Sequence, residues 1–163
     1  MNSSKFGVLL ILTFFAIGCA STSNIEINKS DGLDKNLSIT EVEAVNTTGE
    51  TFEGIDVEVE MRLAVMEAVR LAELNDRSGT AHKLKVDIVQ YEKGNAAARW
   101  LMPGLGKTIL SVEATLLDEA DKPVASSQAT KSVGAGGAFT IGAWKAVFEG
   151  VAKSLVKDIK DSI

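Results

Sequence analysis

The chain has 163 residues, of which 45% are hydrophobic and 24% charged, with a formal net charge of −5 and an isoelectric point near 5.0. A chain of this size and composition is expected to fold as one globular domain that buries about two thirds of its unfolded surface. The acidic balance argues against nucleic-acid binding through a basic face. A single cysteine excludes a disulfide within the chain.

Residues 1–18 have the three parts of a secretory signal peptide. Lys5 makes the start positive, an uncharged apolar run extends from Phe6 to Ile17, and Gly18, Cys19 and Ala20 supply small residues. The apolar run is shorter than the roughly 20 residues that a membrane-spanning helix needs. We therefore expect a signal peptide that is removed, not a transmembrane helix.

The segment Ala16-Ile17-Gly18-Cys19 resembles the lipobox of bacterial lipoproteins, although Ala16 stands where leucine is usual. In that family the cysteine thiol is acylated, the preceding peptide is removed and the new amino terminus is acylated too. The resemblance implies that Cys19 is lipidated and attached to the membrane. The attachment would be practically irreversible, because each buried methylene contributes about 0.8 kcal/mol. The alternative is an ordinary cleaved signal peptide in which Cys19 is incidental.

The residue after Cys19 is Ala20 and not aspartate. By the sorting rule of lipoproteins in two-membraned bacteria, this resemblance implies the outer membrane, with the domain on the periplasmic face. The inner membrane remains the alternative.

Residues 19–36 are predicted to be a lipidated amino terminus followed by a flexible linker. The segment is polar, rich in serine and asparagine, and interrupted by Asp31-Gly32. A flexible chain of this length spans about 20–25 Å. Ile25 and Ile27 are compatible with a short strand, which the prediction does not include.

Residues 37–163 are predicted to form the folded domain. Hydrophobic alternation and β-branched residues predict strands, while apolar residues at steps of three and four predict helices. The expected strands are 37–46, 81–92, 107–118 and 124–133, and the expected helices are 55–74 and a last helix whose apolar stripe runs from Trp144 to Ile159. We predict an α+β fold in the order β-α-β-β-β-α: a two-layer sandwich with a mostly antiparallel four-stranded sheet, both helices on one face and the other face open.

Motifs for chemistry are weak in this sequence. The segment 103–108 (PGLGKT) has Leu101 where a phosphate-binding loop needs glycine, and a strand follows it where that loop needs a helix. His82 is the only histidine, so no histidine-based metal cluster or catalytic triad is expected, and we predict that it is solvated. The pair Glu41 and Glu43 is expected to lie on a solvated strand face. We therefore expect no enzymatic activity and no cofactor.

Two segments carry apolar residues where loops are usually polar, at 94–104 and 134–142. In the predicted meander both loops lie at the same rim of the sheet. Their apolar residues are a candidate contact patch for a partner protein, a lipid surface or an apolar ligand; the alternative is that the loops fold inward and cap the core. The candidate residues are Trp100, Leu101, Met102, Phe139 and Ile141.

Four features together resemble a known family: Ala97-Ala98-Arg99-Trp100, Gly104-Leu105-Gly106, the acidic-ended segment 112–118 and the glycine-rich stretch before the last helix. They resemble the bacterial envelope lipoproteins known as domain of unknown function family 4410. The resemblance covers roughly residues 81–161 and implies a lipobox followed by a small α+β domain, with no established catalytic residues.

The sequence therefore favours a lipid-anchored envelope lipoprotein that acts as a non-catalytic binding or assembly module. Its expected partners are the membrane, through acyl chains on Cys19, and an envelope protein. The alternative function is a small-ligand carrier or accessory subunit of an envelope transport system, which an internal apolar pocket lined by Trp144 and Phe148 would favour.

Overall fold

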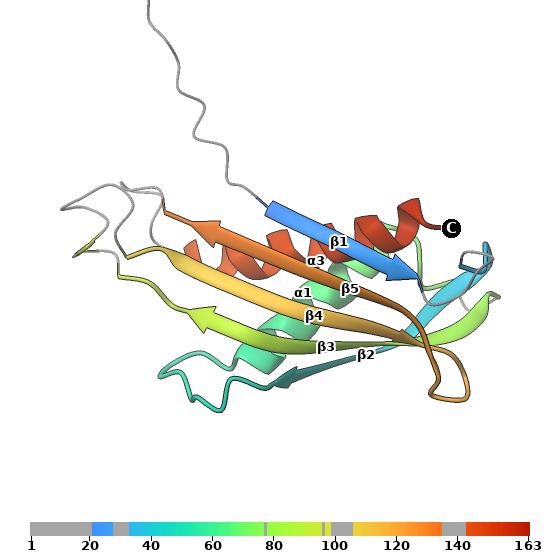
Figure 1. Cartoon of the computed structure of the whole chain (residues 1–163), viewed down its shortest axis with the longest axis horizontal. Helices are drawn as coiled ribbons and strands as arrows, with labels where there is room; N and C mark the ends of the chain where they lie inside the picture. The colour runs from blue at the N-terminus through green and yellow to red at the C-terminus, as the bar shows by residue number, and fades with distance from the viewer. Residues whose placement is uncertain (1–20, 28–32, 77, 96, 99–105, 135–142) are drawn as a thin grey trace, which may run out of the picture.

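The computed structural model describes residues 21–27, 33–76, 78–95, 97–98, 106–134 and 143–163. These residues form one sheet with two helices against it (Figure 1). The elements in chain order are β1 (Ser21–Ile27), β2 (Leu37–Asn46), α1 (Val57–Leu71), β3 (Thr80–Glu92), β4 (Thr108–Leu117), β5 (Pro123–Val133) and α3 (Ala143–Asp161).

The α+β prediction is confirmed, with the six predicted elements in the predicted order. The sheet order is β1-β5-β4-β3-β2. β3, β4 and β5 form the expected antiparallel meander, whereas β2 pairs with β3 in parallel. Because α1 carries the chain back between β2 and β3, the two strands must run in the same direction, as in any crossover connection.

The sheet has a fifth strand that the prediction did not include. Residues 21–27 form β1, which pairs with β5 along its whole length, inside the segment predicted as a flexible linker. The open edge of β5 supplies backbone hydrogen-bond partners, which lets a largely polar segment join the sheet. The flexible part of the predicted linker therefore cannot extend over the whole of residues 19–36.

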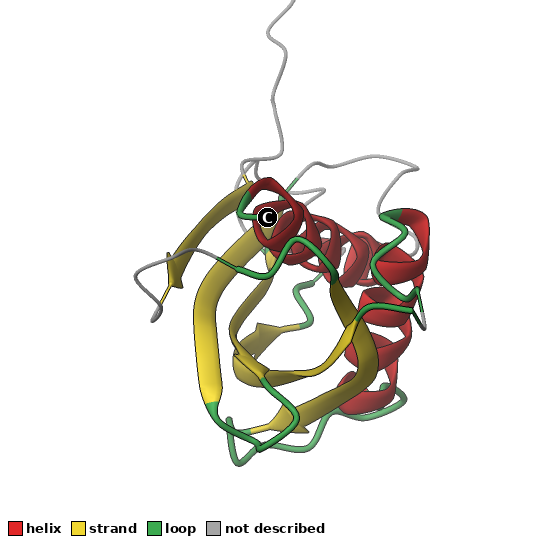
Figure 2. Ribbon diagram, turned by 90° about the vertical axis from the view of Figure 1, so that its right-hand side faces the viewer, coloured by secondary structure: helices red, strands yellow, loops and turns green. Residues whose placement is uncertain are grey.

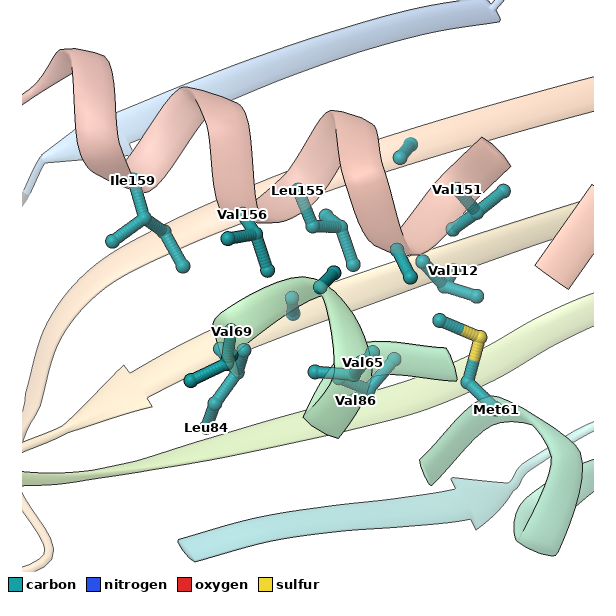
Figure 3. Close-up of a cluster of buried hydrophobic side chains, with 14 of the residues drawn as sticks. Met61, Val65, Val69, Leu84, Val86, Val112, Val151, Leu155, Val156 and Ile159 are labelled. Atoms are coloured by element: carbon teal, nitrogen blue, oxygen red, sulfur yellow. The ribbon is translucent and has the colours of Figure 1, made fainter. Parts of the chain in front are cut away.

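The core lies between the sheet and the two helices. Alternate residues of β3 and β4 point into it, and the buried stripe of α3 covers them (Figure 3). In Figure 2 the sheet curves around the helices. The buried sheet residues include Leu84, Val86, Ile88, Leu110, Val112, Ala114 and Leu116, and the buried α3 residues are Val147, Phe148, Val151, Ala152, Leu155, Val156 and Ile159.

The opposite face of the sheet is polar, as predicted. Lys83 bridges Glu41 and Glu43 of the neighbouring strand, at 3.2 and 2.7 Å. The Lys83 ammonium lowers the pKa of Glu43, and the two carboxylates raise the pKa of Lys83. Within the described residues, no helix combines the length and apolar character needed to cross a membrane.

Candidate interaction surfaces

One end of the sheet gathers the ends of four strands. Ser21, the first residue of β1, lies opposite Lys131 near the end of β5. β3 ends and β4 begins at this same end, where Glu92 lies opposite Ile109. We call it the anchor end, because Ser21 follows Cys19 by two residues. Two extended residues span at most about 7 Å.

The base of the β3–β4 connection at the anchor end is closed by hydrogen bonds. The Thr108 hydroxyl donates to the Lys93 carbonyl at 2.7 Å, and the Asn95 amide donates to the Gly106 carbonyl at 3.1 Å. Gly106 has a φ of +62°, and a Cβ there would lie 2.4 Å from the Asn95 carbonyl oxygen. Glycine is therefore needed at this position, which holds the two ends of the connection together.

The strand register confirms that the two apolar segments leave the sheet at the same end. Residues 93–107 follow β3, and residues 134–142 follow β5, both at the anchor end. The predicted site residues themselves lie outside the described residues. They are Cys19, Trp100, Leu101, Met102, Phe139 and Ile141.

The outer side of α1 carries a second apolar stripe that the sequence prediction missed. The core stripe of α1, which includes Met61 and Val65, is fully buried, but Val59, Leu63 and Met66 on the other side are 38%, 54% and 51% exposed. These three residues, which we call the α1 ridge, are spaced by four and three positions. The signal was present in the sequence as two apolar stripes on one helix, where a surface helix usually has one.

Hollows lie on both sides of the α1 ridge. The larger is an open groove of about 460 Å³ between α1 and α3. Its walls combine Leu63 and Leu71 from α1 with Lys145 and Lys153 from α3, and Phe148 contributes from the core. On the other side, Met66 and Val59 line smaller hollows against β2. The ridge therefore stands free of its neighbours and is open to contact.

The outer edge of β2 is capped at both of its ends. The Ile39 amide donates to the Leu74 carbonyl at 2.6 Å, and the Asn46 amide donates to a carboxylate oxygen of Glu58 at 2.8 Å. Such caps occupy outward-facing amides that could otherwise pair with another strand. Edge-to-edge pairing through β2 is therefore hindered, and the neighbouring helix offers the better contact surface.

His82 differs from the prediction. Its side chain is only 5% exposed, and its Nδ1 lies 2.8 Å from the Thr80 carbonyl oxygen. Alternation along β3 places His82 on the buried face of the sheet together with Leu84, which overrides the polarity of its neighbours in sequence. Among the described residues no group of three or more acidic, histidine or cysteine side chains could hold a metal ion.

The aromatic residues proposed for a ligand pocket lie in a packed cluster. Phe148 is 2% exposed and contacts Tyr91 and Trp144, with ring centroids 5.4 and 6.3 Å apart. Tyr91 also packs edge-on against Phe52 at 4.8 Å. Phe148 thus contributes to the floor of the open groove between the helices, whereas Trp144 is a partly buried flank of the core.

Comparison with two solved structures of one dodecameric protein shows the same fold. The chain is similar to the PelC dodecamer from Paraburkholderia phytofirmans, with 11% identity, a TM-score of 0.58, and coverage of 85% of this chain and 97% of that one. A single-substitution variant of that dodecamer matches with 12% identity, a TM-score of 0.55 and coverage of 83% and 97%. A protein assigned as a lipoprotein from Caulobacter crescentus CB15 matches with 19% identity, a TM-score of 0.43 and coverage of 73% and 84%.

Comparison of the sequence gives the family. No curated protein matches the chain. A family model, the domain of unknown function DUF4410, matches residues 25–137, and this match begins inside β1 and ends just after β5. It covers the whole sheet apart from the first residues of β1. The chain therefore belongs to the DUF4410 family.

Proposed function

We propose that this protein is a lipid-anchored module of the bacterial envelope that is held close to the outer membrane and works there as a homo-oligomeric assembly unit. The observation that carries the proposal is the distance along the chain between Cys19 and β1. Only Ala20 separates the lipidation residue from the first strand of the sheet. Acyl chains on Cys19 would hold the anchor end within several ångströms of the lipid headgroups.

The chemistry of the anchor end supports contact with a membrane. Lys93, Lys107 and Lys131 belong to this end, in a chain whose net charge is −5. Lysines placed near anionic lipids contribute about 1 kcal/mol each. The two connections that contain apolar residues, Trp100 and Phe139 among them, leave the sheet at the same end. Glu92 lies at the same end, so the support comes from the three lysines together with the two apolar connections, which suit the headgroup region better than bulk water.

Self-association is supported by the likeness to the PelC dodecamer and by the exposed ridge of α1. The likeness covers most of both chains. A non-catalytic module with an exposed apolar ridge has a physical reason to assemble, because burying that ridge removes apolar surface from water. We therefore assign the protein to envelope assembly and not to catalysis.

The anchor is tested in cells with Cys19→Ser. We expect radiolabelled palmitate to mark the wild-type protein and not the variant, and we expect the variant to move from the membrane fraction to the soluble periplasm. Unlabelled wild-type protein, or a variant that stays equally membrane-bound, would contradict the proposed attachment.

Contact between the anchor end and the membrane is tested separately, on the Cys19→Ser chain. Binding to vesicles that contain anionic lipid should fall when Trp100 and Met102 are both replaced by serine, while the melting temperature stays close to that of the parent. Unchanged vesicle binding together with a large loss of stability would show instead that these residues cap the core.

A second candidate function, the carriage of a small amphipathic ligand, is favoured by the groove between α1 and α3. Its apolar floor suits an acyl chain. Its walls carry both signs of charge, Lys145 and Lys153 beside Glu60, Glu67 and Glu149, so an anionic head would have to contact the two lysines. Binding of a fluorescent fatty acid that weakens in Lys145→Glu and Lys153→Glu would support carriage. Equal binding by these variants and the wild type would contradict it.

A further inference from the structure

We propose that the α1 ridge is the contact between two copies of this chain, and that the two α1 helices pack in parallel around a two-fold axis. The inference rests on the self-association proposed above and names the surface that would carry it. The ridge residues Val59, Leu63 and Met66 follow the spacing of a coiled-coil seam, in which apolar residues alternate at steps of four and three. Arg70 occupies the next position of the same seam.

The ridge residues do not belong to the core packing of a single subunit. Met61, Val65 and Val69 fill the core on the opposite side of α1, so the ridge contributes little to the fold (Figure 3). A helix with apolar residues on two sides is typical of one that is buried on both. In a single copy the outer side is exposed, and a second copy of the same helix would cover it.

Charge selects the parallel arrangement. If Leu63 and Met66 are the two core positions of a heptad, Arg62 and Glu67 occupy the flanking positions on opposite sides of the seam. The structure agrees, because Arg62 lines the hollow on the β2 side and Glu67 lines the groove on the α3 side. In a parallel pair, Arg62 of each copy faces Glu67 of the other. The two Arg70 side chains also approach each other at the end of the seam, where each is hydrogen-bonded to Glu67 of its own helix. An antiparallel pair would place arginine against arginine and glutamate against glutamate, which is unfavourable.

The flanking residues are available for these contacts. Glu67 accepts two hydrogen bonds from Arg70 within its own helix, and this guanidinium lowers the pKa of Glu67. Both side chains are more than half exposed, so the pair is free to exchange partners. Arg62 has no ion-pair partner among the residues that the structure describes.

The geometry also suits two chains held by one membrane. α1 has 15 residues and is roughly 22 Å long, and its seam, from Val59 to Arg70, spans fewer than two full heptads. A seam of this length is weak between free molecules, but a shared membrane raises the effective concentration of the partners. A rotation about an axis parallel to α1 does not change the height of any atom along that axis. Ser21 therefore lies at the same height in both copies, and both tethers reach the same bilayer.

The test uses the full lipidated chain in intact cells, with one new cysteine placed in α1. Leu63→Cys should form a disulfide-linked dimer on mild oxidation, because symmetry brings the two copies of a seam residue together in a parallel pair. Leu71→Cys is the matched control, because Leu71 is equally exposed, 58% against 54%, but lies off the seam. We expect at least a fivefold greater yield of dimer from Leu63→Cys. Similar yields from both variants would overturn the proposed contact.

A charge exchange tests the parallel register. In the Leu63→Cys background, Arg62→Glu should lower the dimer yield several-fold, and the added change Glu67→Arg should restore it. No loss with Arg62→Glu, or no recovery in the double variant at an unchanged melting temperature, would overturn the parallel pairing.

Chemical crosslinking of the wild-type protein through its lysines separates this inference from the proposed function. Crosslinked oligomers that persist while Leu63→Cys gives no dimer would overturn the α1 contact and leave self-association standing. Monomer alone, under every condition, would overturn both.

Discussion

At the scale of single residues, burial in the core changes the acid–base behaviour of Tyr91. Tyr91 is the only tyrosine, is 4% exposed, and packs between Phe52 and Phe148. Its hydroxyl has no hydrogen-bond partner among the described residues. Burial, with a smaller contribution from the Glu60 carboxylate, raises its pKa to about 12. The phenol is therefore kept neutral well above the pH at which a solvated tyrosine ionises.

This shift predicts a loss of stability in alkaline solution. An unfolded chain ionises its tyrosine near pH 10, so the stability that the neutral phenol contributes is complete below pH 10 and is lost as the pH rises through about 12. The phenolate absorbance of Tyr91 should remain absent until the pH exceeds 11 or the domain unfolds. Titration of the absorbance at a normal value near 10 in the folded domain would contradict the buried position.

Tyr91→Phe provides the matched variant. The substitution removes a buried hydroxyl without a partner and keeps the ring contacts, so it should leave the free energy of unfolding at neutral pH unchanged or raise it by up to about 1 kcal/mol. The variant should also lose the part of the alkaline destabilisation that belongs to Tyr91. Chemical denaturation at pH 7 and above pH 10 measures both effects.

At the scale of elements, α1 depends on its capping residue. Asp56 precedes the helix in an extended conformation, and its carboxylate accepts the Val59 amide at 3.0 Å. Glu58 and Glu60 in the first turn, and Arg70 in the last, complement the helix dipole. At the other end, the Lys160 ammonium of α3 donates to the Ala72 carbonyl at 2.8 Å. A side chain thus caps each end of α1, and at the last turn that side chain comes from the neighbouring helix.

Removal of the cap should have a measurable cost. Asp56→Ala leaves the Val59 amide without its partner, so we expect a loss of about 1 kcal/mol in the free energy of unfolding. Asp56→Asn is the control, because asparagine caps helices about as well and should remain within about 0.5 kcal/mol of the wild type. Equal losses in both variants would show that charge, and not the cap, is what matters at this position.

At the scale of the whole molecule, both helices contact the sheet and each other, yet they contribute unequally to the core. α3 packs against α1, β5, β1 and β4, and its apolar stripe is buried from Val147 to Ile159. α1 packs on α3 and β2 but leaves its ridge exposed. Stability should therefore depend on the α3 stripe, and association on the outer side of α1.

Substitution of one leucine in each helix tests whether stability depends on the α3 stripe and not on the exposed side of α1. Leu155→Ala empties a fully buried site under α3 and should cost about 3 kcal/mol or more in the free energy of unfolding. Leu71→Ala, at 58% exposure, should change it by less than about 0.5 kcal/mol. Denaturant unfolding of the unlipidated domain compares the two. Similar losses in both variants would contradict the assignment of Leu155 to the core and of Leu71 to the surface.

The sequence alone determined the elements that have strong periodicity. The buried stripe of α3 and the alternation of β3 and β4 are local patterns, since a side chain's direction repeats every 3.6 residues in a helix and every two in a strand. Residues 37–46 were likewise predicted with their observed bounds. The lipobox resemblance at Cys19 and the common rim of the two apolar connections also follow from order along the chain.

Only the tertiary structure decided features that depend on neighbours distant in sequence. β1 exists because β5 offers it a free edge, which the polar composition of residues 21–27 does not reveal. His82 is buried because it lies on the core face of β3, and Val59, Leu63 and Met66 are exposed because α1 meets the sheet through its other stripe. Periodicity identifies which side chains share a face, but packing against the remaining elements determines which of those faces is buried.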